Sequence, residues 1–223
     1  MPRSVRSSFS ERGDGDLRID ADPAELAARR QAVAPGEWTW LRQVHGARVV
    51  EVITPGEHAG AEADAAVTAI PGAVLAVHTA DCAPVLLESD DAAVVGAAHA
   101  GWRGLVAGVL EQTVASMEGL GATGIRARMG PHIRGRCYEF GTDELELVAA
   151  RYGDDVRATT AWGTPALDVT AAVRGALGSV GVEVSDRGGC TACEPHRLWS
   201  HRARGDRARM AATIAIVEPG TAA

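Results

Sequence analysis

Four short apolar segments dominate the middle of the chain. They cover residues 65–69, 73–80, 84–88 and 92–98, and only brief turns separate them. Each segment is too short and too continuously apolar to form an amphipathic helix. Runs of this kind are typical of strands that are buried on both faces. The sequence therefore predicts a sheet at the centre of the fold, and the rest of the chain must cover both faces of that sheet.

Other patterns predict helices outside the sheet. Asp22-Pro23-Ala24-Glu25 has the cap, the proline and the glutamate of a helix start, and this helix should run to about residue 33. Apolar spacing and capping residues predict further helices over 105–117, 142–152 and 170–180, with Thr142 as the cap of the second. Shorter strands are predicted at 3–10, 38–44, 49–53, 125–129, 182–185 and 210–217.

This order of elements mixes hairpin-like strands with separate helices. It predicts an α+β fold with helices outside a mixed sheet. The sequence contains no internal repeat and no linker that would mark a boundary. We therefore expect residues 1–223 to form a single domain.

The composition limits the partners and the compartment. The chain is 46% hydrophobic and 23% charged, and its net charge of −7 argues against nucleic acid or an anionic membrane as a main partner. It has no run of about 18 apolar residues, which predicts no membrane span. Its first residues lack the apolar region of a signal peptide. We expect a cytoplasmic protein with reduced cysteines, in which anion binding falls to arginine because lysine is absent.

Three polar side chains stand out around the apolar centre: His45, Cys82 and His99. An isolated polar group is costly to bury, so such groups are either well paired or functional. Each of the three follows or ends a predicted strand, so they could converge at one edge of the sheet. Two imidazoles, one thiolate and an open fourth position form a catalytic zinc pattern. The separations along the chain are long, and a buried structural cysteine with two hydrogen-bonded histidines fits the same residues.

The same residues allow a different chemistry. Cys82 could act as a nucleophilic thiolate that His99 or His45 activates, with Asp81 or another acid orienting the imidazole. The residues for this arrangement are present, but their geometry is not visible in the sequence. A thiolate cannot be a nucleophile and a metal ligand under the same conditions, so the two hypotheses exclude each other.

A second group of candidate ligands lies near the end of the chain. Cys190-Thr-Ala-Cys193 is followed closely by His196 and His201. One Cys-x-x-Cys with trailing histidines is consistent with a structural zinc site, with a redox pair or with two reduced thiols in a loop. The motif does not lie between a strand and a helix, which disfavours the redox pair.

Ligand-binding side chains are predicted beside these motifs. Arg103 lies between two glycines just before a predicted helix, where backbone N–H groups and a guanidinium can hold an anion. Gln43 could hydrogen-bond a base or a phosphate, and Trp102 or Tyr138 could stack on a ring. Each residue also has an ordinary interpretation: a surface arginine, an exposed glutamine or a packed aromatic ring.

Several motifs, taken together, resemble those of the YfiH/laccase-domain family, whose members include proteins called polyphenol oxidase and purine nucleoside phosphorylase. Four follow one another in order: Gln43-Val44-His45-Gly46, Ala80–Val85, His99–Gly104 and Gly130–Ile133. Two more resemble the C-terminal motifs of the family: Cys190-Thr191 and Trp199-Ser200-His201-Arg202. The resemblance runs from about Ser8 to Ile216. No single motif would be specific, but four in order are.

The resemblance implies the CNF1/YfiH-like fold, an α/β sandwich with a mixed central sheet and outer helices. It also implies a Zn²⁺ site, with copper as a second option. It implies phosphorolysis of adenosine, inosine and methylthioadenosine together with adenosine deamination, so that a purine nucleoside and phosphate are the partners. Alternatives are a Cys82-dependent hydrolase in peptidoglycan-precursor editing, a copper-dependent polyphenol oxidase (laccase) and a non-catalytic metal-binding protein. The metal ligands and catalytic residues would be His45, Cys82 and His99, and the substrate-binding residues would be Arg103, Gln43, Tyr138 and Arg202.

The sequence also departs from the family pattern. The N-terminal Thr-Arg-x-Gly-Gly is reduced to Ser10-Glu11-Arg12-Gly13-Asp14, and the C-terminal Thr-Gly-Arg becomes Arg207-Ala208-Arg209. His201 replaces the tyrosine of Phe-Ser-Tyr-Arg. These changes affect the expected substrate edge of the pocket and leave the three expected metal ligands untouched.

Overall fold

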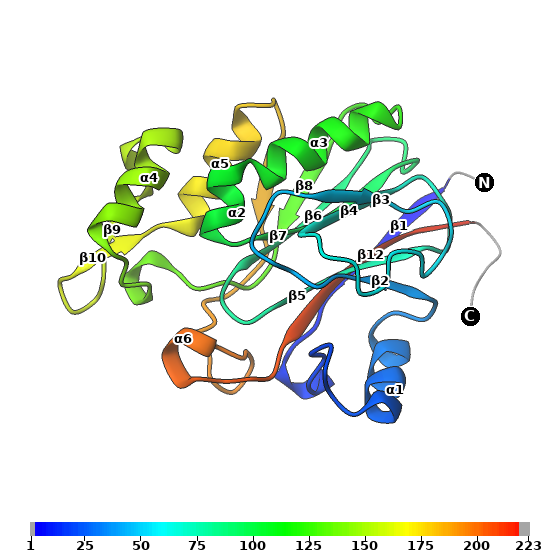
Figure 1. Cartoon of the computed structure of the whole chain (residues 1–223), viewed down its shortest axis with the longest axis horizontal. Helices are drawn as coiled ribbons and strands as arrows, with labels where there is room; N and C mark the ends of the chain where they lie inside the picture. The colour runs from blue at the N-terminus through cyan, green and yellow to red at the C-terminus, as the bar shows by residue number, and fades with distance from the viewer. Residues whose placement is uncertain (1–2, 219–223) are drawn as a thin grey trace.

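The computed structural model describes residues 3–218, and two mixed sheets form its centre (Figure 1). The larger sheet has the strand order β11-β8-β6-β7-β4-β3, the smaller has β1-β12-β5-β2, and β9 and β10 form a separate pair. The strands are β1 Ser4–Phe9, β2 Trp38–Trp40, β3 Val49–Glu51, β4 Ala65–Thr68, β5 Val74–Thr79, β6 Ala83–Glu88, β7 Val95–Ala100, β8 Arg126–Met129, β9 Arg157–Thr159, β10 Pro165–Leu167, β11 Glu183–Asp186 and β12 Met210–Val217.

Helices cover the outer faces of the two sheets (Figure 1). The larger sheet carries α2 (Trp102–Ala107), α3 (Val109–Gly119) and α5 (Val169–Gly178), and α4 (Thr142–Tyr152) packs beside them. The smaller sheet carries α1 (Pro23–Val33), and α6 (His201–Arg204) is one short turn. Three 3₁₀ helices complete the set: η1 Arg12–Asp14, η2 Gly135–Cys137 and η3 Asp154–Val156.

The central strands are rich in apolar residues because each faces two cores. In β6, Val85 and Leu87 pack against the helices, whereas Leu86 packs between the sheets with Leu75 of β5. All four side chains are at most 1% exposed. Complete burial of a leucine side chain contributes about 1.5–3 kcal/mol. The predicted strands buried on both faces are confirmed, as are the α+β class, the mixed sheets and the outer helices.

Some local predictions differ from the structure. The single helix expected over 105–117 is divided, because Gly108 has φ 89° and ends α2 before α3 begins. Gly141, and not Thr142, occupies the N-cap of α4. The expected strand over 38–44 ends at Trp40. The β9–β10 pair and α6 were not predicted, because strands of three residues and a helix of four carry almost no periodic signal.

Four connections cross from one sheet to the other, and three of them carry the polar motifs. Residues 41–48 join β2 to β3, residues 80–82 join β5 to β6, and residues 187–209 join β11 to β12. In the β6–β7 ladder Ala83 pairs with Ala100, which brings the end of the second connection beside the residue after β7. Among the described residues, no helix has both the length and the apolar character to span a bilayer.

Candidate functional site

A pocket of about 680 Å³ opens where the three connections meet. Five arginines and two aspartates contribute to its wall, so positive charge predominates. The arginines are Arg18, Arg103, Arg202, Arg207 and Arg209, and the aspartates are Asp20 and Asp81. The structure also brings all the site residues expected from the sequence to this pocket: Gln43, His45, Cys82, His99, Arg103, Tyr138 and Arg202.

The three expected metal ligands lie together in the pocket. One ligand atom from each of His45, Cys82 and His99 lies within 4.8 Å of the other two. The Cys82 Sγ is 3.9 Å from the His45 Nε2, and the two imidazole rings meet edge to face with centroids 4.9 Å apart. His99 is buried, Cys82 is half-buried and His45 is exposed, so one side of the group is open. These donors fit a zinc ion with an open coordination position.

A buried carboxylate that the sequence analysis missed holds two of these ligands. Asp64 accepts a hydrogen bond from the His99 Nδ1 at 2.8 Å and from the main-chain N–H groups of His45 and Gly46 at 3.0 and 2.7 Å. It also accepts from Val44 N–H, at 3.2 Å. With the proton on Nδ1, the Nε2 of His99 is the nitrogen available for a metal. One feature of the sequence could have pointed to Asp64: it directly precedes the first apolar run.

The charges around Cys82 and His99 shift the pKa values of both groups. Burial raises the pKa of the Cys82 thiol, but the charge of His99 and hydrogen bonds from His45 and His99 outweigh burial and lower this pKa to about 6. Burial lowers the pKa of His99, but the Cys82 thiolate and Asp64 raise it to about 9. Near neutral pH the two groups therefore form a thiolate–imidazolium pair, and a metal ion must displace the imidazolium proton.

The acid next to Cys82 has a different role from the one considered above. The Asp81 carboxylate accepts from the hydroxyls of Thr191 and Ser200, at 2.5 and 2.6 Å, and from the main-chain N–H of Arg202 at 2.6 Å. Its φ of 129° is unfavourable for any residue but glycine, and these hydrogen bonds hold it there. Asp81 therefore anchors the connection from β11 to β12, and the acid that orients an imidazole is Asp64.

The side chain of Gln43 is engaged by the main chain of β5. Its Nε2 donates to the carbonyl of His78 and its Oε1 accepts from the N–H of His78, both at 2.7 Å. The pair of bonds holds the connection from β2 against the neighbouring strand. Burial, together with Arg30 and other nearby cationic groups, lowers the pKa of His78 to about 3, so this imidazole is neutral at the pocket wall.

Two arginines each lie against an aromatic ring at the pocket. The Arg103 guanidinium is 4.5 Å from the ring centroid of Trp102, and that of Arg202 is 5.0 Å from the ring of Tyr138. Stacking on a ring limits the motion of a long side chain and leaves its edge for hydrogen bonding. The two pairs therefore present both a cation and an apolar surface to a ligand.

Gly101 provides a direct test of the crowding around this centre. A Cβ at Gly101 would lie 2.7 Å from the His45 Cδ2 and 3.3 Å from the Cys82 Sγ. Its backbone, with φ −79° and ψ 157°, suits alanine, so Gly101→Ala should keep the fold and displace His45. Loss of the groups that orient a metal ligand costs about 10–100-fold in metal affinity, so we expect a displaced His45 to cost at least about tenfold, measured by competition with a chelator.

Gly119→Ala is the matched control for Gly101→Ala. Nothing lies within 4 Å of a Cβ at Gly119, so this variant should bind metal as the wild type does. Unchanged metal affinity in Gly101→Ala would contradict the placement of His45 and Cys82 around this glycine.

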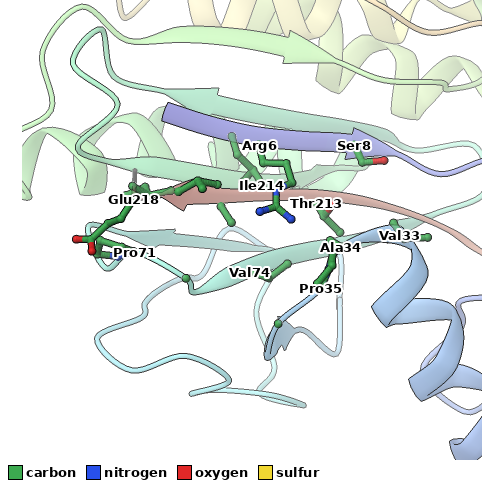
Figure 2. A pocket seen from close by; sticks show the side chains of 15 residues that line it. Arg6, Ser8, Val33, Ala34, Pro35, Pro71, Val74, Thr213, Ile214 and Glu218 are labelled. Carbon is green, nitrogen blue, oxygen red and sulfur yellow. The ribbon is translucent and has the colours of Figure 1, made fainter. Parts of the chain in front are cut away.

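A second hollow of about 350 Å³ lies on the outer face of the smaller sheet (Figure 2). Ala34 and Pro35, just after α1, line one side, and Arg6, Val74 and Ile214 from the strands line the other. None of its lining residues is a histidine or a cysteine. We therefore place the chemistry of the protein in the larger pocket.

Fold and site together define a class of protein: an α/β sandwich in which chain crossings assemble a thiolate and two imidazoles within an arginine-lined pocket. The model of the multi-copper polyphenol oxidoreductase laccase family matches residues 8–217, and the chain belongs to this family. The resemblance inferred from the motifs is thereby confirmed.

Individual proteins of known sequence or structure agree with this assignment. A purine nucleoside phosphorylase of Streptomyces coelicolor is 44% identical over 198 residues, which cover 87% of this chain and 80% of the relative. The crystal structure of the Neisseria meningitidis protein NMB0706 is 28% identical with a TM-score of 0.85, and it covers 96% of this chain and 95% of its own. The YfiH protein of Bacillus licheniformis is 25% identical with a TM-score of 0.83, covering 96% and 93%.

Proposed function

We propose that the chain is a metal-dependent purine nucleoside phosphorylase whose Zn²⁺ ion is held by His45, Cys82 and His99. The observation that carries this proposal is the pocket itself, in which a three-ligand centre lies beside five arginines. A pocket of about 680 Å³ is within the usual range for a small-molecule site and has room for a nucleoside and a phosphate. Relatives named purine nucleoside phosphorylase support the assignment.

The reaction exchanges one bond at the sugar. A phosphate oxygen forms a bond to C1′ of the ribose while the bond from C1′ to the purine nitrogen breaks. The purine leaves with the electron pair and takes up a proton, and the sugar becomes ribose 1-phosphate. Positive charge develops on the ribose in the transition state, so a phosphate anion fixed beneath C1′ stabilises it. When bound, the ion would supply Lewis-acid chemistry to the substrate.

The residues of the chain bind and orient the two substrates. Arg103 and Arg202 would hold the phosphate through paired N–H groups. The rings of Trp102 and Tyr138 would stack on the purine. Asp64 keeps the His99 ring in one orientation through the bond to its Nδ1. In this proposal the pocket binds adenosine, inosine or methylthioadenosine with phosphate, and the same centre also deaminates adenosine.

Arg103→Ala tests the phosphate contact. A hydrogen bond to a charged group contributes about 1.5–3 kcal/mol, so we expect the KM for phosphate to rise about 10–100-fold while adenosine deamination changes little. Steady-state kinetics at varied phosphate would measure this. Arg174, exposed on α5 away from the pocket, is the control, and Arg174→Ala should leave the KM unchanged. Equal losses in phosphorolysis and deamination would argue against a phosphate contact.

Product analysis tests the function itself. The purified protein is incubated with adenosine, and in parallel with inosine or methylthioadenosine, in the presence and the absence of phosphate. Adenine and ribose 1-phosphate that form only with phosphate would establish phosphorolysis, and inosine would establish deamination. If none of the three nucleosides is converted by the zinc-loaded protein, the proposal is wrong.

A second candidate function is hydrolysis by Cys82. It is favoured by one observation: the Cys82 thiolate lies beside His45 and His99, and His99 is bound to Asp64 as in a catalytic triad. The substrate would be an amide or ester of a cell-wall precursor. Activity that survives a chelator but not alkylation of thiols would favour this function over phosphorolysis.

A multicopper oxidase is a further alternative. The groups of side chains among residues 3–218 that could hold a metal ion contain only two histidines, fewer than a multicopper centre needs.

A further inference from the structure

Three cysteines form a second group, and the proposed function uses none of them. One sulfur from each of Cys137, Cys190 and Cys193 lies within 4.8 Å of the other two. The sulfurs of Cys137 and Cys193 are 3.3 Å apart, and all three cysteines are free thiols. The sequence suggested His196 and His201 as partners of the Cys-x-x-Cys motif. Neither belongs to this group, and Cys137 from a distant loop takes the third position.

A tight turn places the sulfurs of Cys190 and Cys193 side by side. The N–H groups of Cys193 and Glu194 both donate to the carbonyl of Cys190, each at 3.1 Å. The Glu194 carboxylate accepts in turn from the N–H of Cys190 at 3.1 Å. Because main-chain bonds hold this turn, the two sulfurs are positioned without any contribution from a bound ion. The carboxylate of Glu194 is already engaged, and sulfur is the only ligand type in the group.

Arg134 holds the loop that carries Cys137 against the segment before Cys190. Its guanidinium donates to both carboxylate oxygens of Asp186, at 2.5 and 2.9 Å, and to the carbonyl of Gly188 at 2.5 Å. This contact fixes the two segments to each other independently of the thiols. The three sulfurs are therefore largely in place before an ion binds. Binding then requires less free energy to order the ligands.

We propose that Cys137, Cys190 and Cys193 form a second zinc site, separate from the centre at Cys82 and built from three thiolates. Thiolate ligands select soft and borderline ions, of which Zn²⁺ takes four ligands in a tetrahedron. Cys193 is exposed, so the fourth position is open to water. On binding, the three thiols release their protons to solvent and three sulfur–zinc bonds form. No atom is oxidised or reduced.

The site would act on the edge of the pocket. Tyr138, which lines the pocket, directly follows Cys137 in the chain, and Thr191, which donates to Asp81, directly follows Cys190. A zinc ion shared by the two segments would add a second link between them, closer to these neighbouring residues than the contacts of Arg134. The role of this ion is therefore structural, and it supports the wall on which a substrate would lie.

The test is the zinc content of purified variants. Cys193→Ser is the main variant, because Cys193 is exposed and its replacement should leave the circular dichroism spectrum unchanged. By plasma mass spectrometry we expect the wild type to hold two zinc ions per chain. Cys193→Ser and Cys82→Ala should each hold one, and the double variant should hold none. The readout does not require nucleoside turnover, so it can succeed or fail independently of the proposed function.

Cobalt substitution gives a second measurement. Co²⁺ bound to thiolates produces charge-transfer absorption in the near ultraviolet, and three of the four metal-binding thiolates belong to the second site. Cys193→Ser should therefore lose the larger share of this absorption and Cys82→Ala the smaller. The proposal is overturned if the wild type holds a single zinc that Cys82→Ala removes, or if copper occupies the three thiolates. It is also overturned if peptide mapping of the freshly purified protein finds Cys137 joined to Cys193 in a disulfide.

Discussion

Cys82→Ala is expected to abolish phosphorolysis and to remove one metal ion per chain. Loss of a residue that only supports a ligand costs about 10–100-fold in metal affinity, so loss of a ligand itself should exceed this range. The substitution removes one sulfur atom from a half-buried position beside the pocket, where the cost to stability is small. Metal analysis and turnover of adenosine with phosphate, made on the same preparation, would measure both effects.

Cys193→Ser is the matched control, since it also replaces a cysteine by a smaller residue but lies outside the group of His45, Cys82 and His99. It should retain the metal at Cys82 and most of the activity. Full activity in Cys82→Ala would refute the assignment of this centre. Full metal content combined with lost activity would instead indicate that Cys82 is a nucleophile.

Asp64→Asn should weaken both the metal centre and the fold. The aspartate is fully buried, and its carboxylate accepts three main-chain N–H groups in addition to the His99 ring. Asparagine retains one acceptor oxygen and turns an NH₂ group toward a donor. Since each hydrogen bond to a charged group contributes about 1.5–3 kcal/mol, we expect the free energy of unfolding to fall by about 3 kcal/mol. Metal affinity should fall about 10–100-fold, because His99 loses the group that sets its tautomer.

Thermal unfolding and chelator competition would measure the two effects of Asp64→Asn. For a chain of this size the expected loss of stability lowers Tm by roughly 10 °C. Asp90→Asn is the control, because Asp90 is exposed and only pairs with Arg126 at the surface, an interaction that contributes at most about 1 kcal/mol. If Asp64→Asn instead has a Tm within 2 °C of the wild type and an unchanged metal affinity, Asp64 does not hold the centre.

The strands of the core were predictable because burial on both faces leaves a continuous apolar run. Their division into two sheets was not, since a strand such as β5 carries no local mark of the neighbour with which it pairs. The same limit applies to side chains. His45, Cys82 and His99 came from motifs, but Asp64 resembles an ordinary polar residue before a strand. Its role depends on His99, which lies 35 positions further along the chain.

Cys137 shows the limit most clearly. The motif from Cys190 to Cys193 was visible in the sequence, and nearby histidines were the natural candidates for further ligands. The actual neighbour of Cys193 lies 56 positions earlier in the chain, in a loop that carries no motif for metal binding. The two loops are brought together by the pairing of β8 with β11, by a main-chain bridge between His132 and Cys190, and by the contacts of Arg134. Contacts that depend on such long-range pairing require the fold to be known.

The link from β5 to β6 makes the pocket sensitive to the alignment of the two sheets. Only three residues, 80–82, connect the two sheets at this point, so the connection is too short to adapt if the sheets move relative to each other. A slip of one sheet over the other by a single residue, about 3.3 Å, would pull Cys82 away from its two imidazoles. Changes in packing at Leu75 or Leu86, between the sheets, should therefore alter the pocket from a distance. Conversely, a ligand bound at Cys82 stabilises the packing of the two sheets against each other and raises the free energy of unfolding.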